Sequence, residues 1–241
     1  MREGFLAVCW KETAVLRRAY GKISSYVSTL MYVMFFGVFP AWFLREALAS
    51  SPLVLFYISL APLVTGAGMA TLAFAGEREN HTLETLLSTP LGERAILLGK
   101  VMVYTIYAWL YALLCLAAGC ITASLLARMT VIPDPALIFS ALWVGALTAL
   151  FSTNMGTLAS LRSGTVKEAG RKLQLLFMMF VVPYIVINFL PDQARAGLMS
   201  ALGRVGVVPI ALLATVVLAV VNLALIRRAA QRFVRREMIL D

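Results

Sequence analysis

Residues 101–127 read VMVYTIYAWLYALLCLAAGCITASLLA, a run of 27 residues without a charged side chain. Crossing the hydrocarbon core of a bilayer takes a helix of about 20 predominantly apolar residues. The run is therefore long enough for one membrane-spanning helix and too short for two.

Five further windows also lack charged side chains: residues 23–44, 47–76, 135–161, 173–191 and 205–226. Two windows carry a helix-start signal, because Ser51 and Asp134 each stand directly before a proline. The sequence thus predicts six spans, at about residues 24–44, 53–76, 101–127, 135–161, 173–191 and 205–226. Pro62, Pro183 and Pro209 lie inside windows, where we expect them to kink the helices.

The composition agrees with an all-α integral membrane protein that forms a single transmembrane domain over residues 1–241. Hydrophobic residues make up 61% of the chain, charged residues 14%, and the mean hydropathy is +0.87. Soluble domains average roughly 45–50% apolar and about 25% charged residues. These values exclude a disordered chain, a nucleic-acid-binding domain and an ordinary soluble enzyme. The three cysteines form no CxxC pair, so we expect neither a disulfide framework nor a metal site.

The distribution of basic residues predicts the orientation in the membrane. Seventeen of the 21 Lys and Arg residues fall in the two terminal segments and in the loops after the second and fourth spans. Only four fall in the three opposite loops. Cytoplasmic loops carry an excess of Lys and Arg, so we expect a multi-pass protein of the cell membrane with both termini cytoplasmic. The net charge of +9 is then a feature of topology, and nucleic acid is not an expected partner.

The six windows contain no Asp, Glu, Lys, Arg or His. Proton- and ion-coupled carriers usually need ionisable groups at membrane depth, and intramembrane proteases need paired carboxylates or a Ser–His dyad. Residues 92–101, GERAILLGKV, have the wrong spacing for a nucleotide-binding P-loop and lack its Ser or Thr. We therefore expect no catalytic residue and no cofactor in this chain, and any energy for transport must come from a separate protein. The amides Asn154, Asn188 and Asn222 are expected to form hydrogen bonds between helices.

Residues 76–100 form a polar loop that contains a short amphipathic helix. Thr82 is placed to cap this helix, and Pro90 ends the segment. Leucines at positions 83, 86 and 87 share one face, and Glu77, Glu79 and Glu84 surround them. The helix is then either a turn whose leucines pack on the bundle, or a docking surface for a soluble partner. The candidate docking residues are Glu77, Glu79, Thr82, Leu83, Glu84, Leu86, Leu87 and Pro90.

Residues 77–91 read ERENHTLETLLSTPL and are followed by Gly99-Lys100. This stretch resembles the signature of type-2 ATP-binding-cassette (ABC) exporter permeases, E-R-E-x-G-T-L-E-x-L-L-x-x-P-L with a Gly-Lys entering the third helix. His81 stands where that family usually has glycine. Because His tolerates the left-handed backbone conformation better than most residues, we expect the turn to form.

Other segments resemble the same family more loosely. Residues 5–20 mix apolar and basic positions, as an interfacial helix before the first span would. Residues 160–169, SLRSGTVKEA, resemble the second cytoplasmic loop, and residues 229–238 resemble the usual basic ending.

The resemblance implies a permease that pairs with a second copy or a homologue to form a substrate path through the lipid bilayer. It further implies that a cytoplasmic ABC ATPase subunit, which hydrolyses ATP, docks on the short loop helix. Leu86 and Leu87 would then enter a groove of the ATPase, with Glu77, Glu79 and Glu84 facing its rim. The main alternative is an ATP-independent channel or scaffold subunit, followed by a secondary transporter and, last, a membrane enzyme. No feature of the sequence selects the transported substrate.

Overall fold

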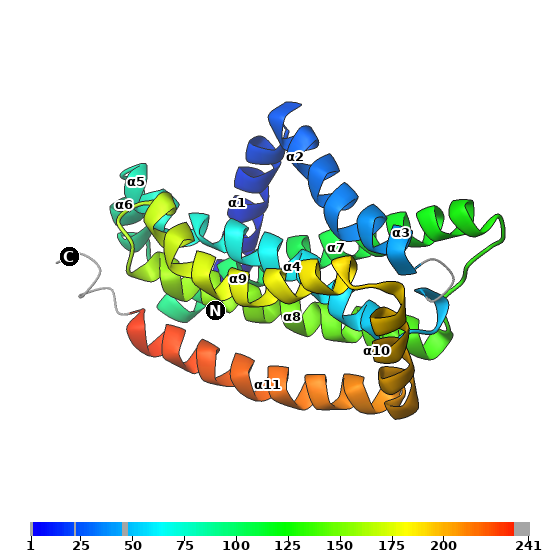
Figure 1. The fold of residues 1–241 in the computed structure, drawn as a ribbon. Coiled ribbons are helices and arrows are strands. Elements are labelled where there is room, and N and C mark those ends of the chain that lie inside the picture. The colour runs from blue at the N-terminus through cyan, green and yellow to red at the C-terminus, as the bar shows by residue number, and fades with distance from the viewer. Residues whose placement is uncertain (1, 22, 45–47, 234–241) are drawn as a thin grey trace.

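The computed structural model describes residues 2–21, 23–44 and 48–233, and within these ranges the chain is helical without strands (Figure 1). The elements are α1 (Arg2–Tyr20), α2 (Ile23–Val33), η1 (Met34–Val38), α3 (Phe39–Leu44), α4 (Leu53–Ala70), η3 (Leu72–Gly76), α5 (Glu77–Glu79), α6 (Leu83–Leu87), α7 (Glu93–Ala127), α8 (Pro135–Leu161), α9 (Val166–Phe189), α10 (Asp192–Val205) and α11 (Val207–Arg232). The elements η1 and η3 are π-helical turns.

Five helical segments are long and apolar enough to cross a membrane: Ser25–Leu44, Leu53–Glu79, Glu93–Ala127, Pro135–Leu161 and Val207–Arg232. A sixth is counted if Val166–Gln174 and Phe177–Phe189, which meet at 52°, form one span. The all-helical fold is thus as predicted, with five or six candidate spans. The helix α8 has the expected bounds, and α7 ends at the expected residue.

Local sequence explains where two of these helices begin. Pro135 occupies the first turn of α8 after Asp134, where a proline loses no helical hydrogen bond. Before α4, the Ser51 Oγ accepts a hydrogen bond of 3.3 Å from the Leu53 N–H. The signal before α8 thus has the predicted positions, although the Asp134 side chain does not cap the helix, whereas in α4 the N-cap residue is Pro52 and not Ser51.

The expected fifth span and the expected kinks differ most from the structure. The bend in α9 lies between Gln174 and Phe177, before Pro183. Pro209 lies in the first turn of α11, where it need not kink the helix, and Pro62 lies within one continuous helix, α4. The chain also forms α10 between the last two candidate spans, a helix that the sequence patterns did not predict. Arg235 and Arg236 of the basic ending lie outside the described residues.

The centre of the bundle is α4, which packs against both α8 and α7. Glycines allow the backbones to approach closely. A Cβ added at Gly156 of α8 would lie 2.6 Å from the Ala67 carbonyl oxygen of α4, and one at Gly66 would lie 2.3 Å from the Ser152 Oγ. Such close approach of small residues is typical of membrane helices, which gain little from burying apolar side chains that lipid already solvates.

The last helix, α11, is attached to the bundle mainly through α8. Asn154 donates a hydrogen bond of 3.0 Å to the Asn222 side chain, whose amide nitrogen donates in turn to the Leu147 carbonyl oxygen at 3.1 Å. The expected hydrogen bonds between helices are confirmed for these two amides. The Asn188 amide instead donates within its own helix, to the Tyr184 carbonyl oxygen.

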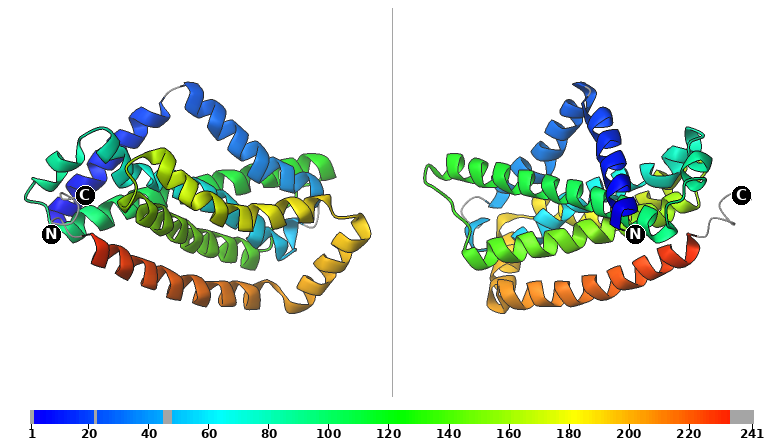
Figure 2. Two further views of the ribbon diagram at one scale, coloured as in Figure 1. Left: turned by 60° about the vertical axis from the view of Figure 1, so that its left-hand side comes forward. Right: turned by 180° about the vertical axis from the view of Figure 1, so that it is seen from behind.

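Helices α1 and α2 form an arch beside α7 (Figures 1 and 2). At one foot of the arch, the position of Gly99 in α7 leaves room for Val8 of α1. At the other foot, a Cβ at Gly37 would lie 2.8 Å from the Cys115 carbonyl oxygen of α7. Between these two contacts the chain runs away from the bundle along α1 and back along α2. Both ends of the arch therefore pack against the same helix, α7.

We expect Gly156→Ala to destabilise the protein, because the new methyl group would overlap the α4 backbone. Overpacking of this kind typically costs about 1–3 kcal/mol. Gly145 on the same helix provides the control, since a Cβ there would lie 3.8 Å from its nearest neighbour, Ile58 Cγ2. Thermal unfolding in detergent should show a lower melting temperature for Gly156→Ala only. Equal melting temperatures for the two variants would contradict the close contact.

Candidate functional site

The loop that resembles a permease signature folds as two short helices, α5 and α6, joined by a tight turn. The turn is closed by hydrogen bonds from the His81 N–H to the Arg78 carbonyl oxygen at 3.1 Å and from the Thr82 N–H to the Glu77 carbonyl oxygen at 2.8 Å. His81 has a φ of 55°, in the left-handed region. The expectation that histidine supports this turn in place of glycine is confirmed.

The leucines of α6 face the protein's own core. Leu83 and Leu86 are only 5% and 7% exposed and pack in a cluster with Phe74, Ile96 and Val8. This burial corrects the expectation that Leu86 projects into a partner and fits the alternative in which the leucines pack on the bundle. The physical reason is that apolar side chains of α1 and of the start of α7 already form a cluster in which these leucines are buried. The side chain of Leu87 lies outside the described residues.

The polar candidates occupy the outer surface of the same loop. Glu79, Thr82, Glu84 and Pro90 are exposed. Thr82 stands at the N-cap position of α6, but its hydroxyl does not cap the helix and instead donates to the Glu77 carbonyl oxygen at 3.3 Å. The loop therefore presents an acidic, hydroxyl-bearing outer face on an apolar base.

Beneath the loop lies a buried group of charges around Lys100, near the start of α7. Lys100 is 0% exposed, and its ammonium group lies 2.8 Å from the Glu12 carboxylate of α1, which is 2% exposed. The ammonium also lies 3.0 Å from the Glu77 carboxylate of α5 and donates to the Ala73 carbonyl oxygen at 2.7 Å. We call Glu12, Glu77 and Lys100, with Lys11 and Tyr104, the charge cluster.

The charge cluster also changes the role expected of Glu77. Instead of facing a partner, its carboxylate pairs with Lys100 and with Lys11 of α1. Lys100 additionally lies 5.2 Å from the centre of the Phe74 ring, a favourable position for a cation over an aromatic face. Glu77 is thus a link within the protein, because an ammonium removed from water needs nearby anions.

Glu12 remains a carboxylate in this position. Burial raises the pKa of Glu12, but the Lys100 ammonium, hydrogen bonds from Lys100 and Tyr104, and the charge of Lys11 together lower it below its ordinary value. The Tyr104 hydroxyl donates to the second carboxylate oxygen at 2.8 Å. Both oxygens of Glu12 are therefore satisfied by α7.

A second connection joins the loop to α8 through the π-helical turn η3. Ser160 Oγ accepts hydrogen bonds from the N–H groups of Phe74, at 2.9 Å, and Ala75, at 2.7 Å, and donates to the Thr71 carbonyl oxygen at 3.0 Å. A π-helical turn disturbs the regular pairing of backbone groups. The single hydroxyl of Ser160 satisfies three of these groups and fixes the end of α4 against α8.

The loop between α8 and α9 also contacts α5. Arg78 donates to the Ser163 carbonyl oxygen at 2.9 Å, and the Glu79 carboxylate accepts from the Val166 N–H at 3.1 Å. Thr165 caps α9 by accepting from the Glu168 N–H at 3.2 Å. The two loops that were related to the permease family separately on sequence therefore form one surface.

Glu12, Lys100 and Ser160 are site residues that sequence reasoning missed. One signal was present for Glu12, because it lies four residues after Val8 and four before Leu16, both of which are buried. A carboxylate in the apolar stripe of a helix indicates a buried partner. Within the described residues no group of three or more His, Cys, Asp or Glu could hold a metal ion. The arrangement joins α1, η3, α5 and α7 by charge pairs and hydrogen bonds.

Comparison with protein families relates the chain to a family of transporters. Residues 17–202 match the family described as ABC-2 family transporter protein. No curated protein matches the chain. The match covers the end of α1, the helix α2, the α5–α6 loop with Glu77, Lys100 of α7, the loop between α8 and α9, and most of α10. Lys11 and Glu12 of the charge cluster lie before it.

Two substitutions at His81 test the left-handed turn. We expect His81→Gly to keep or raise the melting temperature, because glycine adopts a positive φ without steric cost. We expect His81→Val to lower it, since a left-handed residue costs roughly 1–2 kcal/mol and branching at Cβ makes the cost larger. A His81→Val variant as stable as the wild type would show that the turn does not need this conformation.

Removing one member of the charge cluster should strongly destabilise the protein. Lys100→Met removes the buried cation of the cluster and leaves Lys11, which is 41% exposed, as the cation near Glu12 and Glu77; breaking a buried ion pair typically costs about 3–5 kcal/mol. The double variant Lys100→Met/Glu12→Gln should recover part of the loss, as thermal unfolding would reveal. Lys172→Met is the control, because Lys172 forms its ion pair with Glu168 at the surface.

The charge cluster also predicts a dependence on pH. Because the folded-state pKa of Glu12 lies below its ordinary value of 4.5, its stabilising effect is complete above that pH and is lost as the pH falls through the folded-state pKa. Glu12→Gln should therefore reduce the acid dependence of the melting temperature below about pH 4.5. An unchanged pH profile would contradict the role of this carboxylate.

Proposed function

The chain belongs to the ABC-2 family of transporter proteins, and from this premise we propose that it is the membrane-spanning permease subunit of an ABC exporter. It is a multi-pass membrane protein, and permeases of this family generally pair with ATPase subunits. In the proposed assembly, a second copy or a homologue completes the substrate path. A separate cytoplasmic ATPase binds against α5 and α6 and hydrolyses ATP.

The observation that carries this proposal is how the α5–α6 loop is attached to the rest of the protein. Its outer face is exposed and polar, whereas its base is held by buried leucines and by the charge cluster. A loop with no function beyond joining two spans needs neither a buried ammonium group nor connections to three other helices. A loop that receives force from a partner and passes it to the spans needs a firm attachment to several helices, and the buried ammonium group supplies part of that attachment.

The docking surface that we propose consists of the exposed candidates Glu79, Thr82, Glu84 and Pro90. Leu87, a candidate from the sequence, stays part of the proposal. Exposed ion pairs contribute only about 0–1 kcal/mol each, so the acids orient the ATPase more than they hold it. Apolar contact has to supply most of the affinity, at about 1.5–3 kcal/mol for a buried leucine.

Movement of the docked ATPase would reach the membrane helices along two routes. Through Leu83, Leu86 and the charge cluster, displacement of α6 acts on α1 and α7. Through Arg78, Glu79 and the Ser160 hydrogen bonds, displacement of α5 acts on α8 and on the start of α9. Closure of two ATPases would thus switch the spans between inward- and outward-facing arrangements.

The proposed orientation has both termini and the α5–α6 loop in the cytoplasm. It is supported by the concentration of Lys and Arg in the segments on that side. In Figure 2, the start of α1, the α5–α6 loop and the end of α11 lie toward the same end of the bundle. The acidic residue Asp134 lies beyond the far end of α7, a helix of 35 residues and therefore about 52 Å long.

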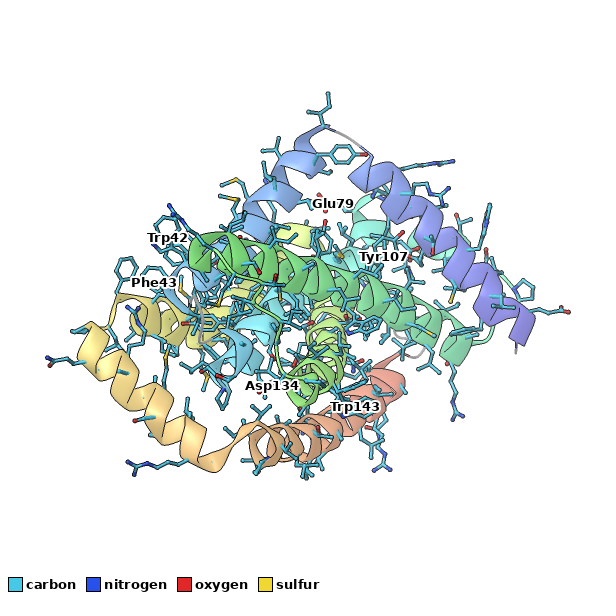
Figure 3. All side chains as sticks on the ribbon, turned by 90° about the vertical axis from the view of Figure 1, so that its right-hand side faces the viewer. Trp42, Phe43, Glu79, Tyr107, Asp134 and Trp143 are labelled. Carbon is cyan, nitrogen blue, oxygen red and sulfur yellow. The ribbon has the colours of Figure 1, made fainter. Side chains whose placement is uncertain are left out.

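Co-purification of the ATPase from cells that express the tagged chain tests the proposal. We expect a P-loop ATPase to accompany the wild-type protein. Glu84→Lys should weaken the association about five- to thirtyfold, because charge reversal replaces an attraction with a repulsion worth about 1–2 kcal/mol in total. Asp134→Lys makes the same charge change in the connection between the end of α7 and the start of α8 and should have no effect. Figure 3 labels Asp134 there and Glu79 on the α5–α6 loop.

Two leucine variants separate docking from folding. Leu86→Asp should lower the permease's own melting temperature, since it places a charge in the core. Leu87→Asp should leave the fold intact and reduce ATPase association per folded molecule. The proposal is wrong if the wild-type protein never retains an ATPase and carries out its transport without ATP, which is the behaviour of a channel or scaffold.

A further inference from the structure

One face of α2 is lined with hydroxyl groups although the helix belongs to an apolar span. Ser25, Ser28, Thr29 and Tyr32 follow the spacing i, i+3, i+4 and i+7, which places them on a single stripe. The opposite face consists of large exposed apolar side chains: Val27, Leu30, Met31 and Met34. The helix is therefore amphipathic, and its hydroxyl stripe lines a pocket, with Ser28 exposed and the other three side chains partly buried.

This stripe forms one wall of a pocket of about 420 Å³ beneath the α2 arm of the arch. The other walls come from α4 and α7, with Thr65, Gly68 and Tyr111 among the lining residues. Gly68 is exposed at this wall, and a Cβ built there would meet no atom within 4 Å. The volume lies within the usual range for small-molecule sites, about 300–1,000 Å³.

The chemistry of the pocket wall is polar but uncharged. Thr29 Oγ1 and the Tyr111 hydroxyl lie 2.8 Å apart and form a hydrogen bond that joins α2 to α7. Hydroxyl groups donate and accept hydrogen bonds, and among the residues that the structure describes none that lines the pocket is charged. This wall matches a molecule whose head group is uncharged and both donates and accepts hydrogen bonds. An ionised head group would find no counter-charge among the described lining residues.

A second cavity shows what distinguishes this pocket. The groove between α4, α8, α9 and α11, of about 460 Å³, is lined almost entirely by apolar side chains. Among its described lining residues, two bear hydroxyl groups, Ser59 and Thr148, whereas six such residues line the pocket of α2, α4 and α7. That groove suits an acyl chain of the bilayer, but it has no polar set that would orient a head group.

We propose that the pocket of α2, α4 and α7 binds the uncharged, hydroxyl-bearing head of a single-chain amphiphile, which is cargo of the permease. The inference rests on the proposed function in treating the bound molecule as cargo. The pocket is lined by residues from the half of α4 nearer the α5–α6 loop and by a residue near the middle of α7, Tyr111. Cargo would therefore enter from the cytoplasmic leaflet through the side of the protein, with its chain remaining among the lipids.

The test uses the full chain in nanodiscs of phosphatidylcholine and a monoacylglycerol with a photoactivatable diazirine in its acyl chain. After illumination, mass spectrometry should locate the label on peptides of α2, α4 and α7. Unlabelled monoacylglycerol should compete, whereas the methyl ester of the same fatty acid, which has no hydroxyl group, should not. Label spread evenly over the lipid-facing helices, or equal competition by the ester, would overturn the proposal.

Matched variants separate binding from changes in fold. Thr29→Val combined with Tyr111→Phe removes two hydroxyl groups at nearly constant shape and should reduce labelling at least fivefold. Thr122→Val combined with Tyr107→Phe makes the same changes outside the pocket and should leave labelling unchanged. Gly68→Leu should block the pocket, with Gly203→Leu on α10 as its control. Labelling that survives both pocket variants would contradict the site.

A last arm distinguishes cargo from a resident lipid and separates this inference from the proposed function. In the complex with the ATPase, ATP and orthovanadate should reduce labelling at least threefold, as expected if the pocket empties when the transporter switches. Unchanged labelling would identify a resident lipid and overturn the assignment as cargo. Because labelling of the permease alone needs no ATPase, a failed pocket with a retained ATPase rejects only this inference.

Discussion

The buried ammonium group of Lys100 constrains the structure more than any other single group. An amine with no solvent exposure has to be surrounded by anions and carbonyl oxygens, because removing a charge from water without compensation costs several kcal/mol. Glu12, Glu77 and the Ala73 carbonyl oxygen supply that surrounding, and they come from three different elements. The interfacial helix α1, the end of the second candidate span and the start of α7 therefore have fixed relative positions.

From this point the candidate site extends by short hydrogen bonds, in addition to the apolar contacts of Leu83 and Leu86. Ser160 holds the π-helical turn just before Glu77, and Arg78 and Glu79 bind the loop that leads into α9. Directional bonds and charge pairs have discrete arrangements, whereas apolar faces in lipid can slide with little change in energy. The loop thus has a rigid attachment at the end of the bundle and an exposed outer face, as a force-receiving element requires.

Farther along the bundle, the packing becomes looser on the side of the arch. The α4–α8 interface is held at backbone contact by Gly66 and Gly156, but α2 approaches α7 mainly through the Thr29–Tyr111 hydrogen bond and the later contact at Gly37. Helix α7 therefore pairs with α1 near its start, at Lys100, and borders an open pocket near its middle, at Tyr111. Tight coupling at one end and a hydroxyl-lined opening beside it place a receiving element and a binding surface on the same helices.

Local signals in the sequence were sufficient for the elements themselves. Charge-free windows predicted the candidate spans, the proline start signals set the beginning of α8, and the left-handed tolerance of histidine predicted the turn at His81. These features depend on neighbouring residues and on the thickness of a bilayer. The bend in α9 and the helix α10 were not predicted, because a hydropathy window records length and polarity but not direction.

Only the tertiary structure decided which way the site residues face. An amphipathic pattern in α6 shows that its leucines share a side, but the apolar seat provided by α1 and α7 determines that Leu83 and Leu86 turn inward. Likewise, Glu12, Glu77 and Lys100 are separated by many residues, and their charges alone suggest three independent surface groups. The sequence by itself determined the membrane helices and the family signature, whereas the burial of one ammonium group, which depends on three elements meeting, determined how they are joined.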